Sequence, residues 1–258
     1  MTIETVAGRV IIVTGASRGI GKGLATYLAR EGATVVCAAR TVAGTTGEFP
    51  GSIDDTVDLI RADGGDAVAV RCDIGVEDDI HALVASTVEQ FGRLDVLVNN
   101  AMTPTHAPLD ASTVEMWDES MRINVRSLYL FTRAVTPVMG ERGGGSIINI
   151  SSGAAAHEVS AFMPPGYVIY SVAKAALERF SSAAAPELRP VGININALRP
   201  GAVRTEHTEQ EFGADFDWSG WAEPEDVGPP VAYLAGQIDT DFTGKVLDVA
   251  GFGRTWGV

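Results

Sequence analysis

A tyrosine and a lysine four positions apart, Tyr170 and Lys174, are the residues of this sequence best suited to proton transfer. They open a stretch in which apolar residues recur at helical spacing, so both side chains are expected on one helix face. A free tyrosine has a pKa of about 10 and is a poor base at neutral pH. A neighbouring ammonium group stabilises the phenolate and lowers that pKa. The pair therefore predicts an acid for carbonyl reduction, or a base for alcohol oxidation.

Tyr167 competes with Tyr170 for this role, because it stands in the same stretch. Four positions after Tyr167 comes Ser171, which carries no positive charge. Tyr170 is therefore predicted to be the proton-transferring residue.

A glycine-rich turn between residues 14 and 21 joins the first apolar run to the first helical pattern. Glycines permit a tight turn and let the backbone approach a pyrophosphate, which then lies at the helix N-terminus. A purely structural turn is the alternative, and the flanking strand and helix patterns favour dinucleotide binding over it. The predicted contacts in this turn are Gly15, Ser17, Arg18, Gly19, Ile20 and Gly21.

The end of the second apolar run indicates which dinucleotide binds. A site for NAD usually has Asp or Glu there to bond the ribose 2′-hydroxyl, whereas this sequence has Ala39 followed by Arg40. Arg40 and Arg18 together suit a 2′-phosphate, because planar guanidinium groups pair well with phosphate oxygens. We therefore predict NADP(H), with NAD(H) less favoured; an ordinary solvated arginine is the alternative for Arg40. Asp73 is expected to contact the adenine and Ile74 the cofactor.

Several short motifs share the order and spacing of one protein family. They are residues 14–21, Asn99 to Ala101, Asn124, residues 149–152, the Tyr170/Lys174 pair and Pro200 with Gly201. With these motifs the sequence resembles the short-chain dehydrogenase/reductase family over nearly its whole length.

The resemblance implies a catalytic set of four residues. Ser152 would hydrogen-bond the substrate oxygen, as the second serine of the pair that it forms with Ser151. Tyr170 would transfer the proton, and Lys174 would bind the nicotinamide ribose and lower the tyrosine pKa. Asn124 would hold a water that links Lys174 to solvent. The further implied cofactor contacts are Asn100, Ala101, Tyr170, Lys174, Pro200, Gly201, Val203 and Thr205.

Three features depart from the family pattern. Met102 stands where a glycine is usual. Its thioether would narrow the pocket and make it more apolar. The alternative is that the substitution is a harmless variation in packing. The loop from His157 to Gly166 is longer than usual and should border the substrate cleft. Pro186 falls late in the Tyr170 helix, where loss of a hydrogen bond predicts a kink or an early end.

The predicted substrate pocket is rich in apolar and aromatic residues, which suggests a hydrophobic ketone or secondary alcohol. The alternative is that the aromatic residues of the loop at about 203–224 only pack its helix onto the body. Within enzymes, enoyl reduction or epimerisation is the second candidate; a non-catalytic NADP-binding regulatory protein is the third. The pocket candidates are Met102, His157, Phe162, Met163, Tyr167, Phe212, Phe216, Trp218 and Trp221.

The elements that must position these residues follow from apolar runs that alternate with helical patterns. This alternation predicts an α/β, doubly wound Rossmann fold: a seven-stranded parallel sheet with helices on both faces. We expect one domain over residues 1–258, with cofactor binding mainly in residues 8–150. The predicted strands are residues 10–14, 34–39, 67–70, 96–98, 146–150, 193–197 and 246–249.

Composition limits the possible partners. The 258 residues carry a formal net charge of −14, which argues against nucleic acid or an anionic membrane as partner and leaves a small-molecule substrate. The start of the chain lacks a signal-peptide pattern, so a cytoplasmic location is expected. The two cysteines, Cys37 and Cys72, are expected to be buried and free, and the four histidines show no metal-ligand spacing, so no metal site is predicted. The resemblance also suggests a homodimer or homotetramer, built through helices within residues 113–142 and 170–188.

Overall fold

The computed structural model describes residues 5–45, 49–156, 165–213, 215–237 and 239–258. Within them, seven strands form one parallel sheet in the order β3-β2-β1-β4-β5-β6-β7. The predicted strands are confirmed, with bounds that differ by at most two residues at either end. The strands are β1 (Val10–Thr14), β2 (Thr34–Ala39), β3 (Asp66–Arg71), β4 (Val96–Asn99), β5 (Gly145–Ile150), β6 (Ile193–Arg199) and β7 (Val246–Asp248).

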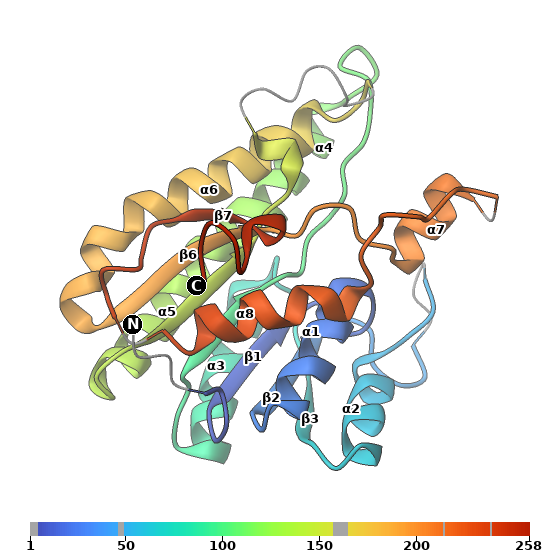
Figure 1. The fold of residues 1–258 in the computed structure, drawn as a ribbon. Helices are drawn as coiled ribbons and strands as arrows, with labels where there is room; N and C mark the ends of the chain where they lie inside the picture. The colour runs from blue at the N-terminus through green and yellow to red at the C-terminus, as the bar shows by residue number, and fades with distance from the viewer. Residues whose placement is uncertain (1–4, 46–48, 157–164, 214, 238) are drawn as a thin grey trace.

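Helices cover both faces of the sheet (Figure 1). Because side chains alternate along a strand, Ile11 and Val13 of β1 join one buried cluster, and Val10 and Ile12 join the other. The first cluster includes residues of α1, α2 and α8, and the second includes residues of α3, α5 and α6. The helices are α1 (Gly19–Arg30), α2 (Ile53–Ala62), α3 (Glu77–Phe91), α4 (Val114–Met121), α5 (Ser127–Glu141), α6 (Val168–Leu188), α7 (Glu206–Phe212) and α8 (Gly228–Ala235). The doubly wound α/β fold predicted from the sequence is therefore confirmed.

The strand order reverses between β1 and β4, which lie side by side although β2 and β3 separate them in sequence. Ligands of open α/β sheets bind outside the carboxyl ends of the strands at such a point. Thr14, at the end of β1, fixes this crevice: its hydroxyl accepts hydrogen bonds from the backbone N–H groups of Asn100 (2.9 Å) and Ala101 (3.0 Å). The glycine turn and the segment after β4 are thus held against each other.

Of the two outcomes expected at Pro186, a kink or an early end of its helix, the early end is wrong. Helix α6 continues through Pro186 and ends two residues later, at Leu188. A proline in the last turn removes a single backbone hydrogen bond, so the cost there stays small enough for the helix to continue.

The cysteines match the sequence expectation. Cys37 and Cys72 are free and buried. Burial raises the pKa of each thiol to about 12, so neither is a ready thiolate. Among the described residues, no helix is both long and apolar enough to cross a membrane.

Candidate active site

Lys174 lies one helical turn after Tyr170 at the start of α6. Its ammonium lies 5.8 Å from the centre of the Tyr170 ring and donates a 2.8 Å hydrogen bond to the carbonyl of Ile150, at the end of β5. The side chain is buried, at 3% exposure. Burial lowers the pKa of Lys174 to about 8, and the negative charge of Glu178 opposes this. The helical spacing of the two residues therefore does bring phenol and ammonium together.

Tyr170 itself is partly buried, and burial raises its pKa above the usual value of about 10, while a hydrogen bond with Ser152 lowers it. In the protein alone, the raised pKa is opposite to the direction expected from Lys174. Desolvation of the phenolate is the larger cause, and the hydrogen bond with Ser152 offsets only part of it.

The two adjacent serines after β5 have different environments. Ser151 is buried, and its hydroxyl donates a 2.7 Å hydrogen bond to the carboxylate of Glu178. Glu178 also forms a two-armed ion pair with Arg199, at 2.7 and 2.8 Å. Ser152 is partly exposed, accepts a 3.2 Å hydrogen bond from the Ala154 N–H, and interacts with Tyr170. Ser152 is thus the serine that faces the phenol, whereas Ser151 belongs to a structural network.

Asn124 lies in a π-helical turn, η1 (Arg122–Arg126), between α4 and α5. Its side-chain oxygen accepts from the N–H of Thr103 at 3.0 Å, and its amide nitrogen donates to the Thr103 carbonyl at 3.0 Å and to Ser120 at 3.1 Å. The side chain therefore ties the segment after β4 to this turn. Turns of this kind interrupt the regular hydrogen bonding of a helix and occur often at functional sites.

The glycine turn before α1 fits the close approach of a backbone and a ligand. Gly15 and Gly19 have φ values of +69° and +51°, which favour glycine. A Cβ at Gly21 would meet the carbonyl of Gly15, and one at Gly15 would lie 2.9 Å from Ala101 Cα. Ser17 and Ile20 lie in the same turn, so the predicted pyrophosphate contacts share one stretch of backbone.

A carboxylate of the chain lies at the first turn of α1. Glu206, the first residue of α7, accepts a 2.9 Å hydrogen bond from the backbone N–H of Gly19. Thr205 lies against Gly19 as well: a Cβ atom added to Gly19 would be 3.3 Å from the methyl group of Thr205. The free N–H groups and the macrodipole at a helix start favour negative charge. Glu206 was not expected at this position from the sequence.

The two predicted arginines lie in different surroundings. One arm of Arg18 donates to the hydroxyl of Thr41 at 3.2 Å, and its buried Nε has no hydrogen-bond partner within the part of the chain that the structure describes. Beside this loop lies a cavity of about 430 Å³, lined by residues of the stretch from Thr41 to Asp55. Arg40 is exposed. It lies near Glu119, whose pKa is lowered mainly by a hydrogen bond with Arg122 and to a smaller extent by the charge of Arg40.

The other predicted cofactor contacts are placed around the same crevice. Asp73 accepts a 2.9 Å hydrogen bond from the N–H of Gly75, in the turn after β3 that also contains the buried Ile74. Pro200 and Gly201 follow β6, and the buried Val203 forms a backbone bridge with Ala222. The chain therefore offers a glycine cradle, an unpartnered buried guanidinium nitrogen and a Tyr/Lys pair at one sheet edge, and these residues fit a phosphate-bearing dinucleotide.

The substrate-pocket candidates divide into two groups. Tyr167 donates a 3.0 Å hydrogen bond to Glu211 of α7, and its ring lies edge-on to Tyr170 at 6.3 Å between centres. Phe212 and Trp218 instead pack with Phe216 and Trp221, at ring separations of 4.6 to 6.3 Å. These four rings contact one another within their own segment, and none belongs to the buried clusters of the body, so both the pocket prediction and its packing alternative stay predictions.

Met102 is 39% exposed after β4, and His157, Phe162 and Met163 lie outside the described residues. One neighbour of the Tyr170/Lys174 pair was not predicted from the sequence. His106 stacks on Tyr167 at 4.0 Å and lies edge-on to Tyr170 at 5.6 Å. A 2.9 Å hydrogen bond from the Ala107 N–H to the Gly166 carbonyl holds its loop beside the start of α6. No local sequence pattern marks a pairing across about 60 positions.

The fold and the crevice define a Rossmann-type oxidoreductase. The family model for short chain dehydrogenases matches residues 9–215. The chain therefore belongs to the short-chain dehydrogenase/reductase family, as its motifs suggested.

Relatives align along almost the whole chain. An uncharacterized oxidoreductase of Methylorubrum extorquens is 38% identical, over 95% of this chain and 97% of its own length. A putative NAD(P) dependent gluconate 5-dehydrogenase of Beutenbergia cavernae, solved with bound NADP, has a TM-score of 0.81 and 29% identity, with 95% and 96% of the two chains covered. A 7α-hydroxysteroid dehydrogenase solved with NADH and 7-oxo glycochenodeoxycholic acid has a TM-score of 0.83 and 28% identity, covering 96% and 95%.

Proposed function

We propose that this protein is an NADP(H)-dependent oxidoreductase that interconverts a carbonyl group and an alcohol, with Tyr170 as the acid or base. The observation that carries the proposal is the arrangement of three side chains: Tyr170 interacts with Ser152 on one side and has the Lys174 ammonium 5.8 Å from its ring on the other. A proton donor, an oxygen-binding hydroxyl and a cation at one place form the set that carbonyl reduction needs.

The glycine turn and Lys174 would hold a bound dinucleotide, whose nicotinamide would be the source of the hydride for the carbonyl carbon in the direction of reduction. The Ser152 hydroxyl donates a hydrogen bond to the substrate oxygen and positions it. Tyr170 transfers its proton to that oxygen, so that the carbonyl becomes an alcohol and the tyrosine a phenolate. The raised pKa of Tyr170 keeps the phenol protonated at neutral pH, which suits the acid role.

Lys174 stabilises the phenolate that this step leaves. Its ammonium is bonded to the Ile150 carbonyl and has further N–H groups, which would donate to a ribose hydroxyl of the bound cofactor. A proton relay through a water at Asn124 would use the backbone carbonyl of that residue, because the side-chain amide is engaged by Thr103 and Ser120. The π-helical turn η1 supports the use of a backbone carbonyl for the relay. The backbone hydrogen bonds of a π-helical turn differ from those of an α-helix, so a carbonyl there can be free of its usual partner.

The preference for NADP(H) rests on Arg18 and Arg40. A 2′-phosphate would satisfy the partnerless Nε of Arg18, and Arg40 is exposed beside the same strand end, which lacks a carboxylate. The structural relatives include one solved with NADP and one solved with NADH, so the preference depends on these residues of the chain and not on the family.

The substrate is proposed to be a hydrophobic small molecule. The ring of Tyr167 lies against that of Tyr170 and offers aromatic surface there, and Met102 is an exposed apolar side chain in the segment after β4. A homodimer or homotetramer is supported by exposed apolar side chains on α4, α5 and α6. These are Val114, Trp117, Tyr129, Val168 and Val172. The cytoplasmic location stays a prediction.

The test is turnover with a panel of hydrophobic ketones and secondary alcohols, followed at the nicotinamide absorbance with both cofactors. We expect ketone-dependent oxidation of NADPH, faster than that of NADH. Activity on enones alone, with the carbonyl retained in the product, would favour enoyl reduction instead. Cofactor binding without turnover of any substrate would favour a regulatory protein.

A further inference from the structure

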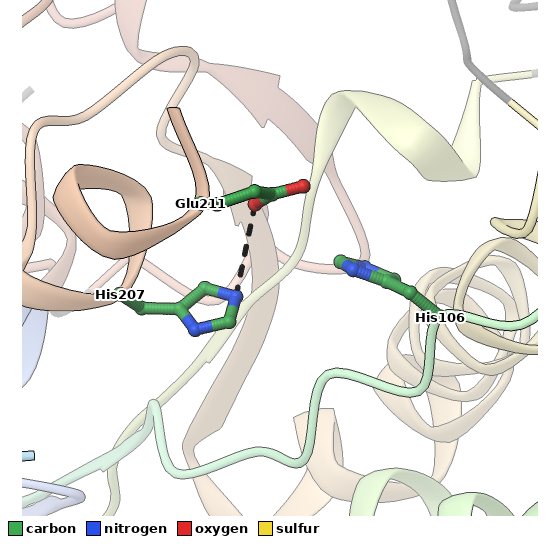
Figure 2. Close-up of side chains that lie close together, drawn as sticks. All are labelled: His106, His207 and Glu211. Carbon is green, nitrogen blue, oxygen red and sulfur yellow. Dashed lines mark ion pairs between the residues drawn. The ribbon is translucent and has the colours of Figure 1, made fainter. Parts of the chain in front are cut away.

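Three potential metal ligands from two distant segments meet beside the catalytic tyrosine. His207 and Glu211 lie one turn apart on α7, and His106 lies on the loop after β4. Figure 2 shows the His106 side chain pointing toward the other two from the opposite side. One ligand atom from each of the three residues lies within 4.8 Å of the others, and these residues are the single such group among the described residues.

The donor atoms suit a transition metal. Two imidazoles and one carboxylate form a ligand set that binds zinc in catalytic sites and leaves one position open. Bonds of about 2.0–2.1 Å to a tetrahedral ion place the ligand atoms ~3.3 Å apart. His207 Nε2 and Glu211 Oε2 are 3.8 Å apart and all three ligand atoms lie within 4.8 Å of one another, so side-chain rotations must bring the three donors closer together around an ion. Two nitrogen donors disfavour magnesium and calcium, which prefer oxygen.

A buried polar atom points to the same conclusion. Among the described residues, Nε2 of His207 is inaccessible to solvent and has no hydrogen-bond partner. Leaving a buried nitrogen without a partner costs ~1–3 kcal/mol, and a metal ion would use its lone pair. His207 and Glu211 alone would form an ordinary i, i+4 ion pair at the surface. The partnerless nitrogen of His207 and the opposing ring of His106 distinguish this group from such a pair.

Neighbouring side chains hold the three ligands in place. The Tyr167 hydroxyl donates to Glu211 Oε1 at 3.0 Å, so that Oε2 is turned toward His207. The His106 ring stacks on Tyr167 at 4.0 Å, and Phe49 packs edge-on against His207 at 5.5 Å. Metal sites commonly have such outer contacts, which orient the ligands and strengthen binding.

We propose that His106, His207 and Glu211 bind one divalent transition-metal ion of the zinc type. The ion joins α7 to the loop after β4 and so fixes the wall of the crevice beside Tyr170, whose ring lies 5.6 Å from that of His106. The formal charge of −14 favours the approach of a cation. The sequence indicated no metal site, because the i, i+4 pair on α7 lacks a third ligand nearby in the chain.

The experiment is calorimetric titration of the untagged, chelator-treated full chain with zinc chloride. We expect one ion per chain, and at least ~10-fold weaker binding in His106→Gln and in His207→Gln. His81→Gln is the matched control, because His81 forms the same i, i+4 pair with Glu77 on α3, at 3.9 Å, outside this group. That variant should bind zinc like the wild type.

Thermal unfolding provides a second readout that does not need turnover, so failure of the metal site and failure of the proposed function are distinguishable. Each variant is first shown to melt cooperatively without metal. Zinc should then raise the melting temperature of the wild type and of His81→Gln. It should not raise that of His106→Gln or Glu211→Gln. Tyr167→Phe should bind zinc more weakly than the wild type. The absence of a stoichiometric site in the wild type, or undiminished binding in both histidine variants, would overturn the proposal.

Discussion

The ammonium of Lys174 donates a 2.8 Å hydrogen bond to the backbone carbonyl of Ile150. Helix α6, which carries Tyr170 and Lys174, is thereby joined to the end of strand β5, which lies between β4 and β6 in the sheet. The bond also holds the lysine in a buried position, where its pKa is lowered to about 8.

Lys174 should make stability depend on pH. Its pKa in the folded state is about 8, below the unfolded value near 10.5, so the unfolded chain binds more protons between these values. Stability contributed through Lys174 therefore rises as pH increases from about 8 toward 10. Urea unfolding at pH 7.5 and 9.5 should show the wild type gaining ~1–2 kcal/mol relative to Lys174→Met. Parallel pH dependence in the two proteins would contradict the lowered pKa.

Glu206 should compete with the cofactor. Its carboxylate accepts from the Gly19 N–H, which a pyrophosphate on the first turn of α1 would also use. Glu206→Gln should therefore bind both NADPH and NADH ~2–5-fold more tightly by fluorescence titration, because one negative charge is removed. Glu209→Gln is the control, since Glu209 lies on the same helix but pairs with Arg204. Equal affinities in wild type and Glu206→Gln would show that the carboxylate does not occupy the anion site in solution.

The two arginines should select the cofactor. Loss of a charge-assisted bond to phosphate costs ~1.5–3 kcal/mol. Arg18→Ala and Arg40→Ala should each raise KM for NADPH about 10-fold and leave KM for NADH nearly unchanged. The NADH assay is the internal control for damage to the fold. An equal loss with both cofactors would assign the arginines a structural role, and an Arg40→Asp variant that still preferred NADPH would contradict the contribution of Arg40.

The adjacent serines offer a matched comparison. Ser152→Ala should lower kcat by at least ~10²-fold with little change in stability, because Ser152 lies beside Tyr170 at a partly exposed position. Ser151→Ala should instead lower the free energy of unfolding by ~1–3 kcal/mol, since it leaves part of the buried Glu178 carboxylate without its 2.7 Å partner. Steady-state kinetics and urea unfolding of both variants test the division. The opposite pattern would exchange the roles of the two serines.

The parts of this structure that the sequence predicts well are governed by local patterns. Continuous apolar runs locate β1 and β2 to the residue, and the spacing of Tyr170 and Lys174 places both on α6. Contacts between distant segments could not be predicted in this way. His106 meets Tyr167 and His207 only because the loop after β4, the start of α6 and α7 converge at one sheet edge.

Two further features depend on the folded structure. The direction of the Tyr170 pKa shift depends on how much water the fold excludes from the phenol, and the sequence shows only the neighbouring charge. Phe212 and Trp218 are apolar rings close in sequence, and the sequence does not show that they contact each other, as they do here at 6.3 Å between ring centres.

The most direct test of the proposed chemistry compares Tyr170→Phe with Tyr167→Phe, two substitutions that each remove one hydroxyl from neighbouring rings. With a ketone that the wild type reduces, Tyr170→Phe should lose at least ~10²-fold in kcat while its cofactor affinity stays the same. Tyr167→Phe should keep kcat within a few-fold of the wild type. A Tyr170→Phe variant that retains wild-type kcat would contradict the assignment of Tyr170 as the proton-transferring residue.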